Sequence, residues 1–214
     1  MNMGFHFENI HSGSTTIHLM SYSTFNPLDY TDKLTDTEVQ RLLTFKSTKR
    51  RQEYTATRIL RSRIFGKKHI YYSEIGAPYI KDIPHFSISH SNHQVGIAVN
   101  EDYYIGLDLE SYRSNILSLR DKFLSQHERD HIDIDSSLDI TKIWSAKEAL
   151  YKLAGRKKII FSEELILSKL TDQKWNGKII NPNNEVFVKL DIFDRNNTII
   201  SINSEAVVKI DRNI

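Results

Sequence analysis

The chain has 214 residues, of which 39% are hydrophobic and 26% charged, and its formal net charge is +2. This length fits one domain or two small lobes that need no disulfide staples. The absence of cysteine excludes disulfides, thiolate metal sites and a cysteine nucleophile. No apolar run approaches the roughly 18 residues of a membrane span, so we expect no membrane partner. The start Met1-Asn2-Met3-Gly4-Phe5-His6 lacks the basic and apolar regions of an export signal, and we expect a cytoplasmic protein.

The chain is predicted to repeat itself at an offset of 90 residues. Three pairs of segments align at this spacing: 17–20 with 107–110, 34–38 with 124–128, and 54–58 with 144–148. The first pair alternates like strands, and the second has the hydroxyl and glutamate of a helix capping box. We therefore expect two similar lobes, 1–104 and 105–214, with any shared site in the groove between them.

A basic helix is predicted in the first lobe. Residues 46–68 carry nine Lys or Arg against one acid, Glu53, whereas residues 97–148 carry eleven acids against six bases. This asymmetry favours a phosphate-rich ligand held with a divalent cation, although charge runs are also typical of solvated faces. Arg51 and Arg58 are seven residues apart, hence on one helix face that could clamp phosphates, meet nucleic acid or simply face water.

Two segments of the first lobe follow this helix. Gly76-Ala77-Pro78-Tyr79 reads as a turn after a strand-like stretch, and alone it indicates only a loop. In Phe86-Ser87-Ile88-Ser89-His90-Ser91 the two apolar residues point inward, and Ser89 and His90 come at the strand end, where they could reach a ligand oxygen or serve as turn residues. A nucleophilic serine is not supported, because the chain has no Gly-x-Ser-x-Gly elbow.

The second lobe is predicted to open with the strand Ile105-Gly106-Leu107-Asp108-Leu109-Glu110. Alternation turns the aliphatic residues to the core and leaves Asp108 and Glu110 side by side on the other face. Adjacent carboxylates repel unless a hard cation such as Mg²⁺ lies between them. The alternative is the polar outer face of a half-buried strand.

The helix Ile143–Leu153 is predicted to bury Ile143, Ala146, Leu150 and Leu153. Trp144, Glu148 and Lys152 share a neighbouring face. Glu148 and Lys152 are either a surface ion pair or a third metal carboxylate followed by a cation for a phosphate.

Both lobes are predicted to end in strands. These cover 86–89 and 95–99 in the first lobe and 186–193, 198–202 and 206–210 in the second. Short turns such as Asp194-Arg195-Asn196-Asn197 make neighbouring strands antiparallel, so the expected class is α+β.

Taken together, these segments resemble the 4′-phosphopantetheinyl transferases of the two-lobed, surfactin-synthetase-activating type. The resemblance covers about residues 35–160. It rests on the order and spacing of four segments: Gly76-Ala77-Pro78-Tyr79, Phe86–Ser91, Ile105–Glu110 and Trp144-Ser145-Ala146-Lys147-Glu148-Ala149-Leu150-Tyr151-Lys152. The Arg-rich segment Arg51–Arg58, which precedes them in the chain, is similar to the family's first-lobe helix.

The resemblance implies an enzyme that moves the phosphopantetheine arm of coenzyme A onto a serine of an apo carrier protein and releases 3′,5′-ADP. It implies Mg²⁺ on Asp108, Glu110 and Glu148, Lys152 near the transferred phosphate, and Ser89 and His90 on coenzyme A phosphates. Ala77 stands where many relatives have a lysine that meets a nucleotide phosphate. The backbone of Ala77 and Pro78 remains available to line an adenine pocket, and Arg51 or another base of the helix would have to compensate.

The expected mechanism is positioning and electrostatic stabilisation of an in-line transfer. Mg²⁺ neutralises the diphosphate, Lys152 stabilises charge on the leaving side, and Glu148 takes the serine proton directly or through a metal-bound water.

Because one chain supplies both halves of the groove, we expect a monomer. One alternative is a non-catalytic carrier-protein or coenzyme A binding module. A second is a nucleic-acid binder, which the acidic segment 97–148 and the near-neutral total charge disfavour. A third is a nucleotide phosphotransferase, which is disfavoured because this chain has no P-loop.

Overall fold

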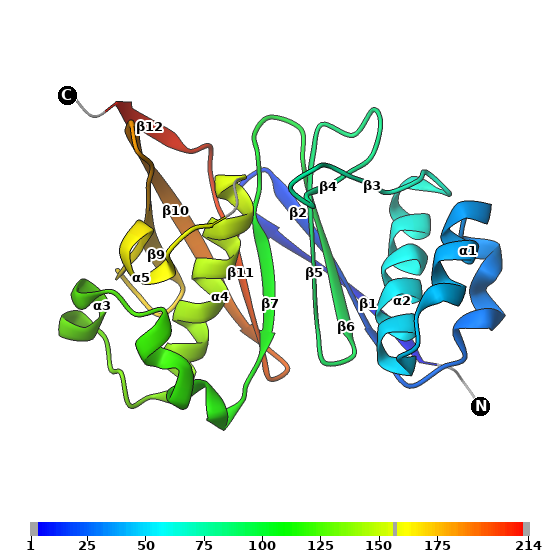
Figure 1. Cartoon of the computed structure of the whole chain (residues 1–214), viewed down its shortest axis with the longest axis horizontal. Helices are drawn as coiled ribbons and strands as arrows, with labels where there is room; N and C mark the ends of the chain where they lie inside the picture. Colours follow the sequence, from blue (N-terminus) through cyan, green and yellow to red (C-terminus); the bar gives the residue numbers. More distant parts are fainter. Residues whose placement is uncertain (1–3, 156–157, 212–214) are drawn as a thin grey trace.

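The computed structural model describes residues 4–155 and 158–211. The export-signal expectation rests partly on residues 1–3, which lie outside the described residues. In the described part of the chain, no helix is both long and apolar enough to cross a membrane. Figure 1 shows two lobes side by side, each with a sheet and a long helix.

The first lobe is an antiparallel sheet packed on two helices. The sheet has the strand order β1-β2-β6-β5, and a short hairpin of β3 and β4 lies apart from it. Its elements are β1 (Phe5–Ser12), β2 (Thr15–Tyr22), the 3-10 helix η1 (Pro27–Lys33), α1 (Asp36–Thr44), α2 (Thr48–Phe65), β3 (Tyr71–Tyr72), β4 (Pro78–Tyr79), β5 (His85–Ser91) and β6 (Gln94–Asn100).

The second lobe repeats this plan. Its sheet has the order β7-β11-β10-β9-β8, with β12 also pairing β10. Its elements are β7 (Leu107–Ser111), η2 (Ser114–Lys122), α3 (Gln126–His131), α4 (Ser137–Ala154), α5 (Phe161–Glu164), β8 (Leu165–Lys169), β9 (Lys174–Ile180), β10 (Asn184–Arg195), β11 (Thr198–Asn203) and β12 (Val208–Asp211). The expected α+β, two-lobed fold is confirmed.

The duplication is visible in the local chemistry of the helix starts. Thr35 and Ser125, 90 residues apart, each cap a helix, and Glu38 and Glu128 complete the two capping boxes. Each of these buried glutamates also binds a fully buried cation of the long helix: Glu38 contacts Arg61 Nη2 at 2.7 Å, and Glu128 contacts Lys147 Nζ at 2.8 Å. One buried ion pair per lobe therefore ties the short helix to the long one.

The apolar core has three main parts. One lies under α4 and one under α2, as expected for helices packed on sheets. The third, which includes Ile17, Leu19, Leu107, Leu109 and Ile200, joins the two sheets. Gly96 makes this approach possible, because a Cβ there would lie 2.9 Å from Leu109 Cδ1. The two lobes thus share buried apolar contact and are fixed relative to each other.

Candidate active site

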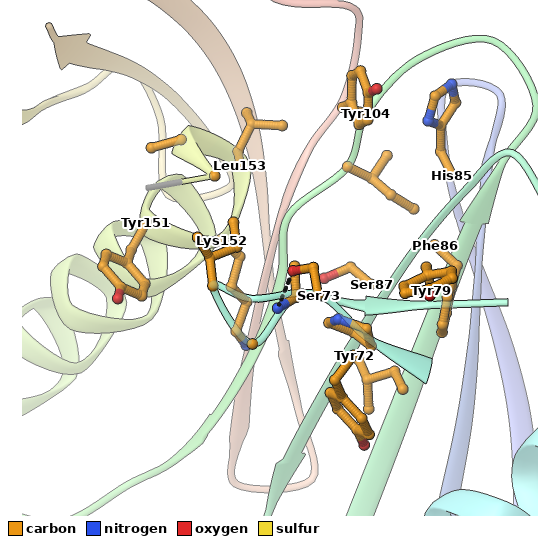
Figure 2. Close-up of a pocket in the computed structure, with 18 of the residues that line it drawn as sticks. Tyr72, Ser73, Tyr79, His85, Phe86, Ser87, Tyr104, Tyr151, Lys152 and Leu153 are labelled. Carbon is orange, nitrogen blue, oxygen red and sulfur yellow. Dashed lines mark hydrogen bonds between the residues drawn. The ribbon is translucent and has the colours of Figure 1, made fainter. Parts of the chain in front are cut away.

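A cavity of about 830 Å³ lies between the lobes. Its walls come from α2, the β3–β4 hairpin, β5, the segment before β7, and the end of α4. Figure 2 shows Lys152 and Leu153 of α4 on one side, facing Phe86 of β5 and Tyr79 of β4 on the other. A cavity of this size is large enough for a cofactor-sized ligand.

The two sheets meet at β5 and β7 through side-chain hydroxyls rather than through a backbone ladder. The backbone N–H groups of Leu107, Leu109 and Ser111 donate to Ser87 Oγ, Ser89 Oγ and Ser91 Oγ at 3.0, 3.0 and 2.8 Å. The constant separation of 20 residues means that the two strands run in the same direction, side by side in the middle of Figure 1. We call these three serines the hydroxyl ladder.

Lys152 and Asp108 form an ion pair at the central rung of this ladder. Lys152 Nζ donates to Asp108 Oδ1 at 2.9 Å, to Ser89 Oγ at 3.1 Å and to the carbonyl oxygen of Leu107 at 2.7 Å. Ser89 Oγ in turn donates to Asp108 Oδ1 at 3.1 Å. Three acceptors match the three ammonium protons, so the cation is held firmly beside the cavity. Gly106 precedes this site because a side chain there would collide with the carbonyl of Ala149 in α4.

Glu148 lines the cavity one turn before Lys152. Burial raises the pKa of Glu148 to about 7, the charge of Asp108 adds to this, and Lys152 opposes it. Burial also raises the pKa of Glu110, whose Oε2 accepts from Trp144 Nε1 at 3.1 Å. The predicted face of α4 is therefore present: Trp144 meets Glu110, and Lys152 meets Asp108, along the length of β7.

The three carboxylates lie near one another without closing on a common point. Among the described residues, no three His, Asp or Glu side chains are gathered tightly enough to hold a metal ion. The donor chemistry nevertheless fits a hard cation, because carboxylate oxygens are its preferred ligands. Asp108 Oδ2 is buried and has no hydrogen-bond partner, and burial, together with the charges of Asp108 and Glu110, raises the pKa of Glu148. Both features are what a bound cation relieves.

His90 stands at the mouth of the same site. It lines the cavity, with Arg50 Nη1 at 3.5 Å from its Nε2 and Glu53 Oε1 at 3.9 Å from its Nδ1. Burial lowers the pKa of His90, and Glu53 opposes that shift. A ring between a cation and a carboxylate can act as a hydrogen-bond donor to an anion.

Arg51 and Arg58, which the spacing places on one face of α2, have different surroundings in the structure. Arg51 Nε donates to the carbonyl oxygen of Phe45 at 2.7 Å, and Arg51 is not among the residues that line the cavity. Arg58 does line it, but is 3% exposed, pairs with Glu38 at 3.3 Å and lies over the ring of Tyr54 at 3.6 Å. A solvated arginine face is therefore wrong for Arg58, because Glu38, 20 residues earlier, draws it inward.

The β3–β4 hairpin brings Ala77 and Pro78 to the cavity wall. Gly76 adopts φ +86°, a left-handed conformation that favours glycine, and the N–H of Ala77 donates to Ser73 Oγ at 3.1 Å. The hairpin thus offers the short Ala77 side chain where a lysine would project a charge.

Sequence reasoning missed Arg50, Glu53 and the hydroxyl role of Ser87 and Ser91. The alternation of serine in Phe86–Ser91 is the signal for the ladder, since three hydroxyls on one side of a strand need acceptors or donors. Arg50 and Glu53 carried no distinguishing pattern within a charge-rich helix.

One segment of the chain that contributes to this site is similar to a known protein family. Residues 104–192 match the model of the 4′-phosphopantetheinyl transferase superfamily. The match includes β7, α4 and the residues Asp108, Glu110, Glu148 and Lys152. No curated protein matches the chain. The matched segment supports a transferase, and phosphopantetheine transfer in general.

Proposed function

We propose that the protein transfers the 4′-phosphopantetheine arm of coenzyme A to a serine hydroxyl of an apo carrier protein and releases 3′,5′-ADP, in the manner of the two-lobed, surfactin-synthetase-activating type. The observation that carries this proposal is that Glu148 and Lys152 line the inter-lobe cavity and that Lys152 pairs with the buried Asp108, all within the segment similar to the superfamily. Arg50 and Arg58 of the basic helix and Glu148 and Lys152 of α4 line one cavity, and such a mixture of charges suits a substrate with several phosphates and a bound cation.

In this mechanism Lys152 stabilises negative charge on the diphosphate, and Arg50 and His90 hold a phosphate on the first-lobe side. Glu148 is suited to accept the proton of the incoming serine, because a base with a pKa of about 7 is half deprotonated at neutral pH. The bond from the serine oxygen to phosphorus forms as the bond to the bridging diphosphate oxygen breaks, and 3′,5′-ADP leaves.

A divalent cation completes the proposal. Mg²⁺ would be held by Asp108, Glu110 and Glu148, and it would supply neutralisation of the diphosphate charge. Thermal unfolding of the free protein tests this without activity: millimolar Mg²⁺ should raise the Tm of the wild type and leave the Tm of Asp108→Asn unchanged. An equal response of both proteins would contradict the metal assignment.

The decisive experiment is intact-mass analysis of apo carrier proteins after incubation with coenzyme A and Mg²⁺. A gain of about 340 Da that EDTA abolishes supports transfer and its metal requirement. Glu148→Gln should lose most of the turnover, by about 10²-fold or more, since base and metal functions both suffer. Absence of a gain with acyl, peptidyl and aryl carriers would favour the alternative, a binding module without catalysis, and coenzyme A titration would then detect the remaining affinity.

A further inference from the structure

We infer that Ser89 is a positioning residue, which acts through Lys152 and Asp108 rather than by touching coenzyme A. This inference rests on the proposed function and changes the role that the family resemblance gives to Ser89. It follows from how the hydroxyl is used, from its burial and from its place between the lobes.

The hydroxyl of Ser89 is already committed. Its proton goes to Asp108 Oδ1, and its lone pairs accept from the N–H of Leu109 and from Lys152 Nζ. A hydroxyl has one proton and two lone pairs, so no hydrogen-bonding capacity remains for a ligand. Ser89 and Asp108 are each 6% exposed, and neither is among the described residues that line the cavity, but Asp108 keeps an unpartnered oxygen, Oδ2, whereas the hydroxyl of Ser89 has all its partners.

The same atom connects the two lobes to the ion pair. Ser89 belongs to β5 in the first sheet, whereas Asp108 and Leu109 belong to β7 in the second and Lys152 to α4. Of the ladder serines, Ser89 is bonded to both charged partners, while Ser91 bonds to Ser111 Oγ at 2.9 Å and to the N–H of Ser111. Ser91→Ala is therefore a matched control, because it removes a rung without touching the ion pair.

The position of Lys152 relative to a phosphate matters for turnover, since charge stabilisation requires donors fixed in advance. Without Ser89, the ammonium loses one of its three acceptors and Asp108 Oδ1 loses a donor. Both side chains gain freedom to turn, so the transition state loses stabilisation while the cavity that binds coenzyme A keeps its lining.

The first test measures Lys152 itself and does not depend on activity. An amine-acylating reagent is applied to the wild type, Ser89→Ala and Ser91→Ala, and labelling of Lys152 is followed by peptide mass spectrometry. Lys152 should be labelled several-fold faster in Ser89→Ala, because an amine that has lost one of its fixed partners turns more often toward the reagent, and at the wild-type rate in Ser91→Ala. Equal rates in all three proteins would overturn the inference.

The second test separates positioning from ligand contact by kinetics. In Ser89→Ala, kcat should fall about tenfold or more while KM for coenzyme A stays within about twofold. Ser89→Thr retains the hydroxyl and should restore both kcat and the labelling rate. A rise in KM with kcat unchanged would instead make Ser89 a ligand contact. If the wild type transfers nothing, the proposed function fails. The labelling result still decides whether Ser89 holds Lys152 in place.

Discussion

Arg58 of α2 and Glu148 of α4 stand 90 residues apart, at equivalent points of the repeat, and both line the cavity between the lobes. At this equivalent position the first lobe has the buried cation Arg58 and the second lobe has the carboxylate Glu148. The two lobes thus share the same arrangement of helices and sheet but differ in charge at this position, so the cavity between them is asymmetric.

Stability should depend on pH through Glu148. Its pKa is raised from 4.5 to about 7, so between these values the folded state holds a proton that the unfolded chain releases. This contribution to stability is present below about pH 4.5 and is lost as the pH rises through 7. Glu148→Gln should therefore be more stable than the wild type at pH 8, by on the order of 1–3 kcal/mol, and similar to it at pH 4.5.

Urea unfolding at the two pH values measures this difference. Glu101→Gln, in the exposed loop after β6, is the control and should alter stability at neither pH. A Glu148→Gln protein that is less stable than the wild type at pH 8 would show that Glu148 is stabilised as a carboxylate in the fold.

The buried pair of Lys147 and Glu128 should be far more important for stability than exposed pairs. Lys147 is 0% exposed, and its Nζ also donates to the carbonyl oxygens of Phe123 and Phe161 at 2.6 and 2.8 Å. Lys147→Ala leaves Glu128 charged and buried, and should cost about 3–5 kcal/mol. Lys189→Ala breaks only the exposed pair with Glu205 and should cost less than about 1 kcal/mol, as measured by urea unfolding. Similar losses in both variants would contradict this assignment.

The sequence predicted those features that depend on local periodicity. Alternation along Ile105–Glu110 gave the inward aliphatic face, and hydroxyl-to-glutamate spacing gave both capping boxes at Thr35 and Ser125. The α+β class followed from short turns such as 194–197, where Asn196 and Asn197 adopt positive φ between antiparallel strands.

Features that depend on long-range contacts were not predictable in this way. Nothing local shows that β5 lies against β7, so the hydrogen bonds of the ladder serine Ser89 to this strand could not be predicted. Arg58 is buried because of Glu38 in another helix. The 90-residue offset also holds only as far as the long helices. The hairpin strands β8 and β9 are longer than β3 and β4, which follow the long helix of the first lobe, so the strands after them are separated from their counterparts by more than 90 residues.

Among the basic residues of α2, Arg50 is the one whose removal should weaken coenzyme A binding without lowering stability. It lines the cavity and its side chain is 51% exposed, so Arg50→Ala removes a phosphate donor at little cost in stability. We expect KM for coenzyme A to rise about tenfold, with unfolding free energy changed by less than about 0.5 kcal/mol. Arg51→Ala, a neighbour that is not among the cavity residues, should leave KM within about twofold. Equal effects of the two substitutions would place the phosphate elsewhere.

Ala77→Lys should strengthen coenzyme A binding. Ala77 is exposed on the hairpin at the cavity wall, and a lysine there adds a charge that can reach a phosphate. Isothermal titration with coenzyme A should give a dissociation constant about 3- to 10-fold lower than that of the wild type, and the gain should shrink at high salt. Ala77→Gln has a similar reach without the charge and should bind as the wild type does. If Lys and Gln act alike, the change comes from contact with the hairpin rather than from charge.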